Sequence, residues 1–172
     1  PELVAAKAKG LPVLHRSDVL AALLNNAKGV AVAGAHGKTT TSAMISCIAA
    51  ESGIDPTIVI GGEVTSLGGN ARNGAGSYVV AEADESDGSF LKFYPHLAVV
   101  TNIEDDHLDH YGTEENIYKA FKQFLGNITE GGKAILCADN AKVRRLAQET
   151  DKTVLTYGIE GEDADFVAKN IT

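Results

Sequence analysis

Apolar runs and helix-like patterns alternate along the chain, an arrangement typical of parallel strands joined by crossover helices. Apolar or amphipathic spacing predicts four helices, over residues 17–27, 40–53, 114–128 and 140–150. Short apolar runs predict six strands, over residues 29–34, 57–62, 77–84, 97–102, 134–139 and 153–158. The pattern therefore predicts an α/β fold, with a mostly parallel sheet flanked by helices.

The ends and faces of these elements can also be predicted. The first helix has Ser17 or Asp18 available as its N-cap. Gly53 is placed to end the second helix, because glycine readily adopts the left-handed conformation of a helix C-terminus. Four apolar residues of that helix share one face and are expected in the core: Met44, Ile45, Ile48 and Ala49. Residues 61–77 contain six glycines and few large apolar side chains, which predicts a loop.

Three predicted strands run directly into polar residues. VAVAG ends at Gly34, VVAEAD carries Glu82 near its end, and VVTN ends at Asn102. In open α/β sheets, ligands bind at the carboxyl edge of the parallel strands. We therefore expect these three ends to converge on one site.

The stretch GAHGKTTT, residues 34–41, has the GK[ST] ending of a phosphate-binding loop, yet Val32 occupies the position of that motif's first glycine. A glycine-rich turn between a strand and a helix directs backbone N–H groups and the helix dipole at a bound anion. Lys38 would add a cation for the terminal phosphates, and Thr39 a hydroxyl for the accompanying Mg²⁺. Three threonines are poor helix formers, so we favour phosphate binding over a surface turn.

Two acidic segments follow at the other strand ends. Glu82 lies where the apolar strand is still running, so its carboxylate should reach the sheet edge and suit Mg²⁺. The charge run that continues to Asp87 is of a kind that usually forms a solvated loop. His107 lies among carboxylates in TNIEDDHLDHY, and its spacing alone leaves open a surface role, a hydrogen-bonding role or a second-metal or phosphate role. His15 and His96 are expected to be surface or hydrogen-bonding residues without a catalytic or metal-binding role.

Composition narrows the function classes. The 172 residues carry a formal net charge of −8, which argues against a nucleic-acid partner. No apolar run reaches the ~18 residues of a membrane span, so no membrane partner is expected. Cys47 and Cys137 lie in apolar surroundings, which favours buried thiols in a reducing cytoplasm over a disulfide or metal pair.

Three segments in order, GAHGKTTTSAM, EADESDGSFL and TNIEDDHLDHY, resemble the Mur ligases, the ATP-dependent amide-forming enzymes of peptidoglycan precursor synthesis. The resemblance covers almost the whole chain. The phosphate loop of that family is the shorter G-x-x-G-K-[ST], which residues 34–39 match, and this accounts for Val32. The resemblance implies a P-loop-type central nucleotide-binding domain.

The resemblance also implies roles for individual residues. Lys38, Glu82 and His107 are the implied catalytic residues. Thr39 and Glu82 would bind the Mg²⁺ that bridges the ATP phosphates, and His107 would bind a second metal. The implied ATP-binding loop comprises Gly34, Ala35, His36, Gly37, Lys38, Thr39 and Thr40. The branch most similar to this chain usually has threonine where Ala35 stands, so one hydroxyl contact is expected to be absent.

That branch joins L-alanine to UDP-N-acetylmuramate through an acyl phosphate, which implies small-molecule substrates and a cytoplasmic location. Residues 1–28 would be the tail of an N-terminal UDP-binding domain with its linker. Residues 29–172 would be the central ATP-binding domain, truncated at its C-terminal end, with a C-terminal domain absent. Such a fragment is expected to be inactive alone. The sequence does not indicate an oligomeric state.

Two alternatives remain open. A recycling ligase attaches a preformed tripeptide to the same sugar nucleotide, although its acidic motif is usually EADEYD-like, unlike the Glu85-Ser86-Asp87 found here. An ATP-binding switch would hydrolyse or sense ATP without any amino acid.

Several sister ligases carry a carbamylated lysine, and the matching position here is Phe121. This departure fits the alanine-adding branch but weakens the prediction of a second metal.

Overall fold

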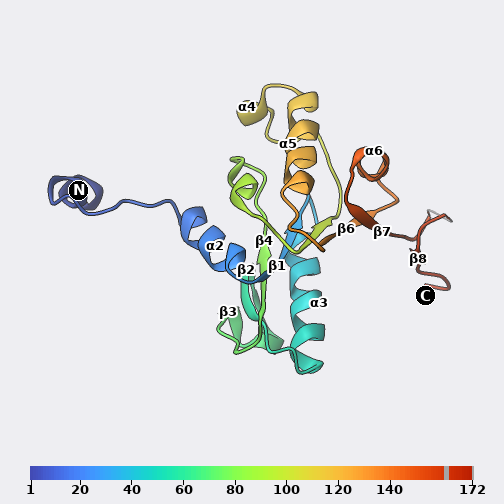
Figure 1. Ribbon diagram of the computed structural model, residues 1–172, viewed down its shortest axis with the longest axis horizontal. Helices are drawn as coiled ribbons and strands as arrows, with labels where there is room; N and C mark the ends of the chain where they lie inside the picture. Colours follow the sequence, from blue (N-terminus) through green and yellow to red (C-terminus); the bar gives the residue numbers. More distant parts are fainter. Residues whose placement is uncertain (161–162, 172) are drawn as a thin grey trace.

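The computed structural model describes residues 1–160 and 163–171. Its strands form an eight-stranded sheet of order β3-β2-β4-β1-β5-β6-β7-β8, and only β3 runs antiparallel to its neighbour (Figure 1). The strands are β1 (Lys28–Ala33), β2 (Thr57–Val64), β3 (Gly69–Arg72), β4 (Tyr78–Glu82), β5 (Leu97–Val100), β6 (Lys133–Cys137), β7 (Thr153–Gly158) and β8 (Phe166–Val167). The predicted α/β class and mostly parallel sheet are confirmed.

Six α-helices and two 3₁₀ turns are present among the described residues. They are α1 (Glu2–Ala8), α2 (Arg16–Asn25), α3 (Lys38–Glu51), η1 (Thr65–Leu67), η2 (Ser89–Lys92), α4 (Leu108–Tyr111), α5 (Glu114–Gly126) and α6 (Ala141–Glu149). Gly53 has φ +79° just beyond α3, as predicted. The helix predicted over residues 114–128 is confirmed as α5, although it ends at Gly126, and five apolar residues of this segment are buried: Ile117, Phe121, Phe124, Leu125 and Ile128.

Alternate residues of the central strands face opposite sides of the sheet. Ala31, Ala81 and Ala98 lie in register and, being small, let α2, α5 and η2 pack closely on one face. Phe90 of η2 contacts two rings of α5 there. Its ring centroid lies 5.3 Å from that of Phe121 and 5.1 Å from that of Phe124. This cluster is the main core. The other face carries the larger β-branched residues, and α3 contacts it.

The predicted buried face of α3 is wrong in part, because Ile45 and Ala49 are half-buried against the sheet but Met44 and Ile48 are not. Met44 and Ile48 are 55% and 70% exposed, whereas Ser42 and Ser46 are fully buried. The rotational phase of α3 is set by the loop that begins it, and this phase turns the small serine side chains towards the sheet. Periodicity of apolar residues does not report that constraint.

The predicted loop over residues 61–77 is also wrong in part. β2 continues to Val64, and η1 and the antiparallel β3 occupy much of the remainder. Glycines therefore mark the turns of this segment, with Gly68 and Gly69 at φ +75° and +147°. Backbone pairing with β2 orders it despite its few apolar side chains.

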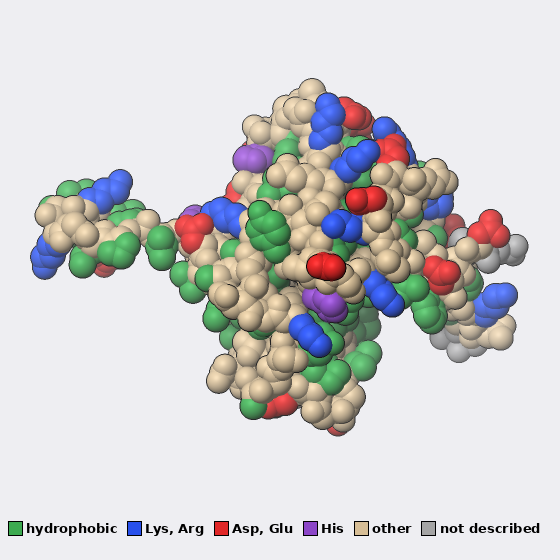
Figure 2. Space-filling model, viewed as in Figure 1, with side chains coloured by type: hydrophobic (Ala, Val, Ile, Leu, Met, Phe, Trp, Pro, Cys, Tyr) green, Lys and Arg blue, Asp and Glu red, His purple; other side chains and the backbone are tan. Residues whose placement is uncertain are grey.

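The N-terminal segment has two distinct parts. α1 projects away from the body on an extended connection and shows apolar side chains on its surface (Figures 1 and 2). α2 instead packs on the sheet and buries Leu24 completely. It begins one residue before Ser17, with His15 as N-cap, because the His15 ring accepts the Ser17 N–H and Asp18 accepts the His15 N–H. The predicted cap was therefore wrong.

Candidate functional site

A tight turn joins β1 to α3 at the carboxyl edge of the sheet. β1 ends at Ala33, and α3 begins at Lys38, with Gly37 as a left-handed N-cap at φ +81°. Gly34 has φ +139°, and a Cβ there would collide with Thr101 Oγ1 and approach the Asn102 backbone. A Cβ at Gly37 would meet no described atom within 4 Å, so only backbone conformation matters there. The loop therefore requires glycine at both positions, but for different reasons.

This difference gives a matched pair of variants. Gly37→Ala should destabilise the chain by about 1–2 kcal/mol, the penalty for a left-handed alanine. Gly34→Ala adds a collision with Thr101, so it should destabilise the chain by a further ~1–3 kcal/mol beyond the loss in Gly37→Ala. Urea unfolding of both variants measures the difference. Equal losses would show that the contact between Gly34 and Thr101 does not constrain the loop.

The residues that follow β5 hold the loop between β1 and α3 in place. Thr101 Oγ1 donates to the carbonyl oxygens of His36 and Ala33, at 2.7 and 3.3 Å. The Asn102 amide exchanges two hydrogen bonds with the backbone of His36, both of 2.9 Å. These bonds join residues that are 65 to 68 positions apart in the sequence, as the predicted convergence of strand ends requires.

Glu82, at the end of β4, lies against the start of α3. Thr39 Oγ1 donates to Glu82 Oε2 at 3.2 Å, and the Gly61 N–H donates to Oε1 at 2.7 Å. A hydroxyl and a carboxylate side by side are the hard oxygen ligands that Mg²⁺ takes beside phosphate oxygens. The donor set of Thr39 and Glu82 therefore fits the predicted metal.

Lys38 points back across its own loop. Its Nζ donates to the Gly34 carbonyl oxygen at 2.7 Å and to Glu85 Oε1 at 2.9 Å. The Lys38 and Glu85 side chains are only 18% and 4% exposed. The sequence prediction treated this acidic run as a solvated loop and so missed Glu85. The available sequence signal was its place only three residues beyond Glu82, close to the end of the predicted strand.

His107 lies near Glu85, with 3.8 Å between its Nε2 and Glu85 Oε1. Its φ of +60° is unusual for a non-glycine residue and places it as the N-cap of α4. The structure thus places Thr39 beside Glu82 and places His107 beside the ion pair of Lys38 and Glu85. A second-metal role for His107 stays a prediction.

Phe121, at the position of the sister ligases' modified lysine, is 1% exposed within the main core. Lys119 is exposed, and Lys122 forms an ion pair of 2.8 Å with Glu149. None of these three residues is arranged as a metal ligand. Cys47 and Cys137 are free and half-buried rather than fully buried.

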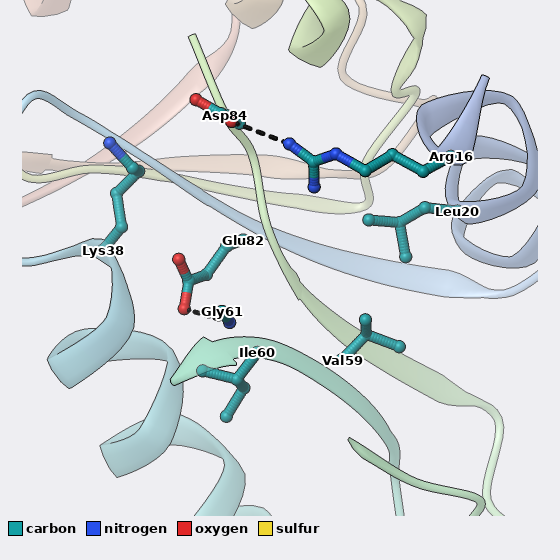
Figure 3. Close-up of a pocket in the computed structure, with 8 residues that line it drawn as sticks. All are labelled: Arg16, Leu20, Lys38, Val59, Ile60, Gly61, Glu82 and Asp84. Carbon is teal, nitrogen blue, oxygen red and sulfur yellow. Dashed lines mark hydrogen bonds and ion pairs between the residues drawn. The ribbon is translucent and has the colours of Figure 1, made fainter. Parts of the chain in front are cut away.

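A cavity of about 290 Å³ adjoins the loop on the α2 side. Figure 3 shows its walls, which are Arg16, Leu20, Lys38, Val59, Ile60, Gly61, Glu82 and Asp84. Arg16 and Asp84 form an ion pair of 3.0 Å at its rim. Burial acts to raise the pKa of Asp84, but hydrogen bonds from Ser86, the charge of Lys38 and the hydrogen bond from Arg16 lower it overall. The cavity therefore has an apolar floor and charged groups of both signs beside the phosphate loop.

His36 of the loop is exposed, and its Nε2 lies 3.4 Å from Glu104 and 4.0 Å from Asp106. These three groups could meet around a cation, but exposed acidic groups commonly gather without one.

Within residues 1–160 and 163–171, no helix is both long and apolar enough to cross a membrane.

Residues 32–172 match the family model described as the Mur ligase middle domain. The chain belongs to the Mur ligase family. A UDP-N-acetylmuramate–L-alanine ligase of Pelotomaculum thermopropionicum is 53% identical over 99% of the chain. The chain spans 37% of the length of that curated relative.

Two solved Mur ligase structures have the same fold. The UDP-N-acetylmuramate–alanine ligase of Thermotoga maritima aligns with a TM-score of 0.80 at 31% identity, covering 93% of this chain and 36% of that one. A murein peptide ligase of Psychrobacter arcticus aligns with a TM-score of 0.81 at 26% identity, covering 99% of this chain and 40% of that one. The architecture is thus common to more than one branch of the Mur ligases.

Proposed function

We propose that this chain is the ATP-binding part of a cytoplasmic ligase that joins L-alanine to UDP-N-acetylmuramate. The contact between Thr39 and Glu82, beside the loop that ends in Lys38, carries the proposal. It gathers phosphate-binding and metal-binding groups at one sheet edge, as phosphoryl transfer requires. The 53% identity to a ligase of that name supports the choice of L-alanine.

The proposed reaction has two steps. The muramate carboxylate attacks the γ-phosphorus of ATP, ADP leaves, and an acyl phosphate forms. The amine of L-alanine then attacks the acyl carbon, inorganic phosphate leaves, and the amine loses a proton. Backbone N–H groups of residues 34–40 would hold the phosphates, and Lys38 would neutralise charge on the terminal ones. Thr39 and Glu82 would hold Mg²⁺, which supplies further charge neutralisation when bound.

We propose further that residues 29–172 are the central domain of a longer protein and that residues 1–28 lead into it from a UDP-binding domain. The chain covers only 37% of the length of its 53%-identical relative, which supports this division. The 172-residue chain alone should then bind ATP but release no phosphate in response to acceptor and amine. Ligation by the isolated chain would contradict the proposed division.

Phosphate release by a full-length protein containing this chain tests the proposed function. The mixture holds Mg-ATP and UDP-N-acetylmuramate, and L-alanine, other amino acids or the tripeptide are added singly. Release that needs the sugar nucleotide and is fastest with L-alanine is expected. Preference for the tripeptide would place the protein in the recycling branch. Release indifferent to acceptor and amine would indicate an ATPase or switch.

A further inference from the structure

We propose that Glu85 is a positioning residue that holds the Lys38 ammonium group where the terminal phosphates of ATP will bind. The inference rests on the proposed nucleotide-binding function of the loop. Glu85 is distinct from Glu82, because it contacts the lysine and not the Thr39 hydroxyl.

The Lys38–Glu85 pair is placed to limit a flexible side chain. A lysine ammonium has three N–H donors on a four-carbon stem with many rotamers. Two of its donors are engaged, one by the Gly34 carbonyl oxygen and one by Glu85 Oε1. The third remains to donate to a phosphate oxygen. Two fixed acceptors therefore define where the charge lies before the nucleotide arrives.

Glu85 is itself held firmly. Its backbone carbonyl oxygen accepts hydrogen bonds from the Gly88 N–H at 3.1 Å and from the Tyr111 hydroxyl. Burial, and then the negative charges of Glu85 and Asp87, raise the pKa of Tyr111 to about 12. Tyr111 therefore stays protonated and able to donate at neutral pH. Tyr111 belongs to α4, so this bond ties the Glu85 segment to the His107 segment.

The burial of Glu85 shows that the carboxylate is not there as a solvated charge. Glu85 as a whole is 3% exposed. Its Oε2 atom is buried without a hydrogen-bond partner among the described residues. A buried carboxylate is unfavourable unless a cation lies beside it. Here Lys38 lies at 2.9 Å and His107 at 3.8 Å. The carboxylate thus depends on the same lysine that it positions.

The test compares Glu85→Gln with Asp109→Asn in the full-length protein. Asp109 is an exposed carboxylate of α4, so its variant removes one nearby negative charge without touching Lys38. Because a misplacement of about 1 Å can slow a reaction roughly 100-fold, Glu85→Gln should lower kcat about 10- to 100-fold. The KM for ATP should change less than about threefold, since the phosphate loop's N–H groups are intact.

A second readout does not depend on ligase activity. Acetylation of Lys38 by dilute acetic anhydride, followed by peptide mass spectrometry, reports how firmly the amine is held. The rate relative to exposed Lys119 should rise several-fold in Glu85→Gln and stay unchanged in Asp109→Asn.

These outcomes separate the two proposals. A kcat per folded molecule equal to that of Asp109→Asn, together with unchanged acetylation, would overturn the role of Glu85. If the wild-type protein shows no acceptor-dependent release, the proposed ligase function fails, and acetylation alone decides the role of Glu85.

If Glu85→Gln does not fold, Glu85→Asp replaces it, because it keeps the charge but withdraws the oxygens by about 1.5 Å. A fully active Glu85→Asp with unchanged acetylation would then refute the inference.

Discussion

Lys38→Ala is expected to slow amine-dependent phosphate release by the full-length protein about a thousandfold. In the proposed function, the ammonium group is the cation that neutralises charge on the terminal phosphates, and removing such a group from phosphoryl transfer costs roughly 10²–10⁵ in rate. A thousandfold loss corresponds to about 4 kcal/mol of transition-state stabilisation. Steady-state release at saturating L-alanine and sugar nucleotide measures it.

Lys119→Ala is the matched control for this prediction. It also removes one lysine charge, but from an exposed position on α5 away from the loop. Its turnover should stay within about twofold of the wild type, as for most surface substitutions. Turnover by Lys38→Ala above one-tenth of the wild-type rate would mean that the loop does not use this lysine for phosphoryl transfer.

The location of the site could be predicted because it follows from parallel topology. Once the apolar runs are taken as parallel strands, their carboxyl ends must meet at one edge. The bonds of Thr101 to the loop and of Thr39 to Glu82 confirm that convergence. The short form of the loop was identified only through the resemblance to the Mur ligases, and the positive φ at Gly34 and Gly37 explains why its two glycines are required.

The roles of individual side chains were harder to predict, because they depend on distances that no local pattern encodes. Glu85 and Asp87 stand in the same acidic run, yet Glu85 is buried against Lys38, whereas Asp87 accepts a hydrogen bond from the Ser89 N–H. His15 was expected to be a surface or hydrogen-bonding residue, and it is a hydrogen-bonding one, although its place as the N-cap of α2 was not predicted. Likewise, the loop fixes the phase of α3 and exposes Ile48. Tertiary contacts decided the cases of Glu85 and of α3, whereas the His15 cap is formed by local bonds with Ser17 and Asp18.

The Lys38–Glu85 pair also predicts a large effect on stability. Lys38→Ala leaves the Glu85 carboxylate buried without its nearest cation, and breaking a buried pair in this way typically costs about 3–5 kcal/mol. Since the Lys38 side chain is partly exposed, the lower end, about 3 kcal/mol, is expected for unfolding of the 172-residue chain in urea. The double variant Lys38→Ala/Glu85→Gln should recover roughly 2 kcal/mol of this loss, because a neutral amide is far less costly to bury than a lone carboxylate.

The recovery distinguishes charge burial from lost packing. If Lys38→Ala were destabilising because its methylene stem leaves a gap, neutralising Glu85 would restore nothing, and the two substitutions would add. The pair Lys38→Ala/Asp109→Asn provides the control, since Asp109 is exposed and its neutralisation should leave the loss from Lys38→Ala unchanged. Additive losses in Lys38→Ala/Glu85→Gln would therefore contradict the view that the lysine and the buried carboxylate depend on each other.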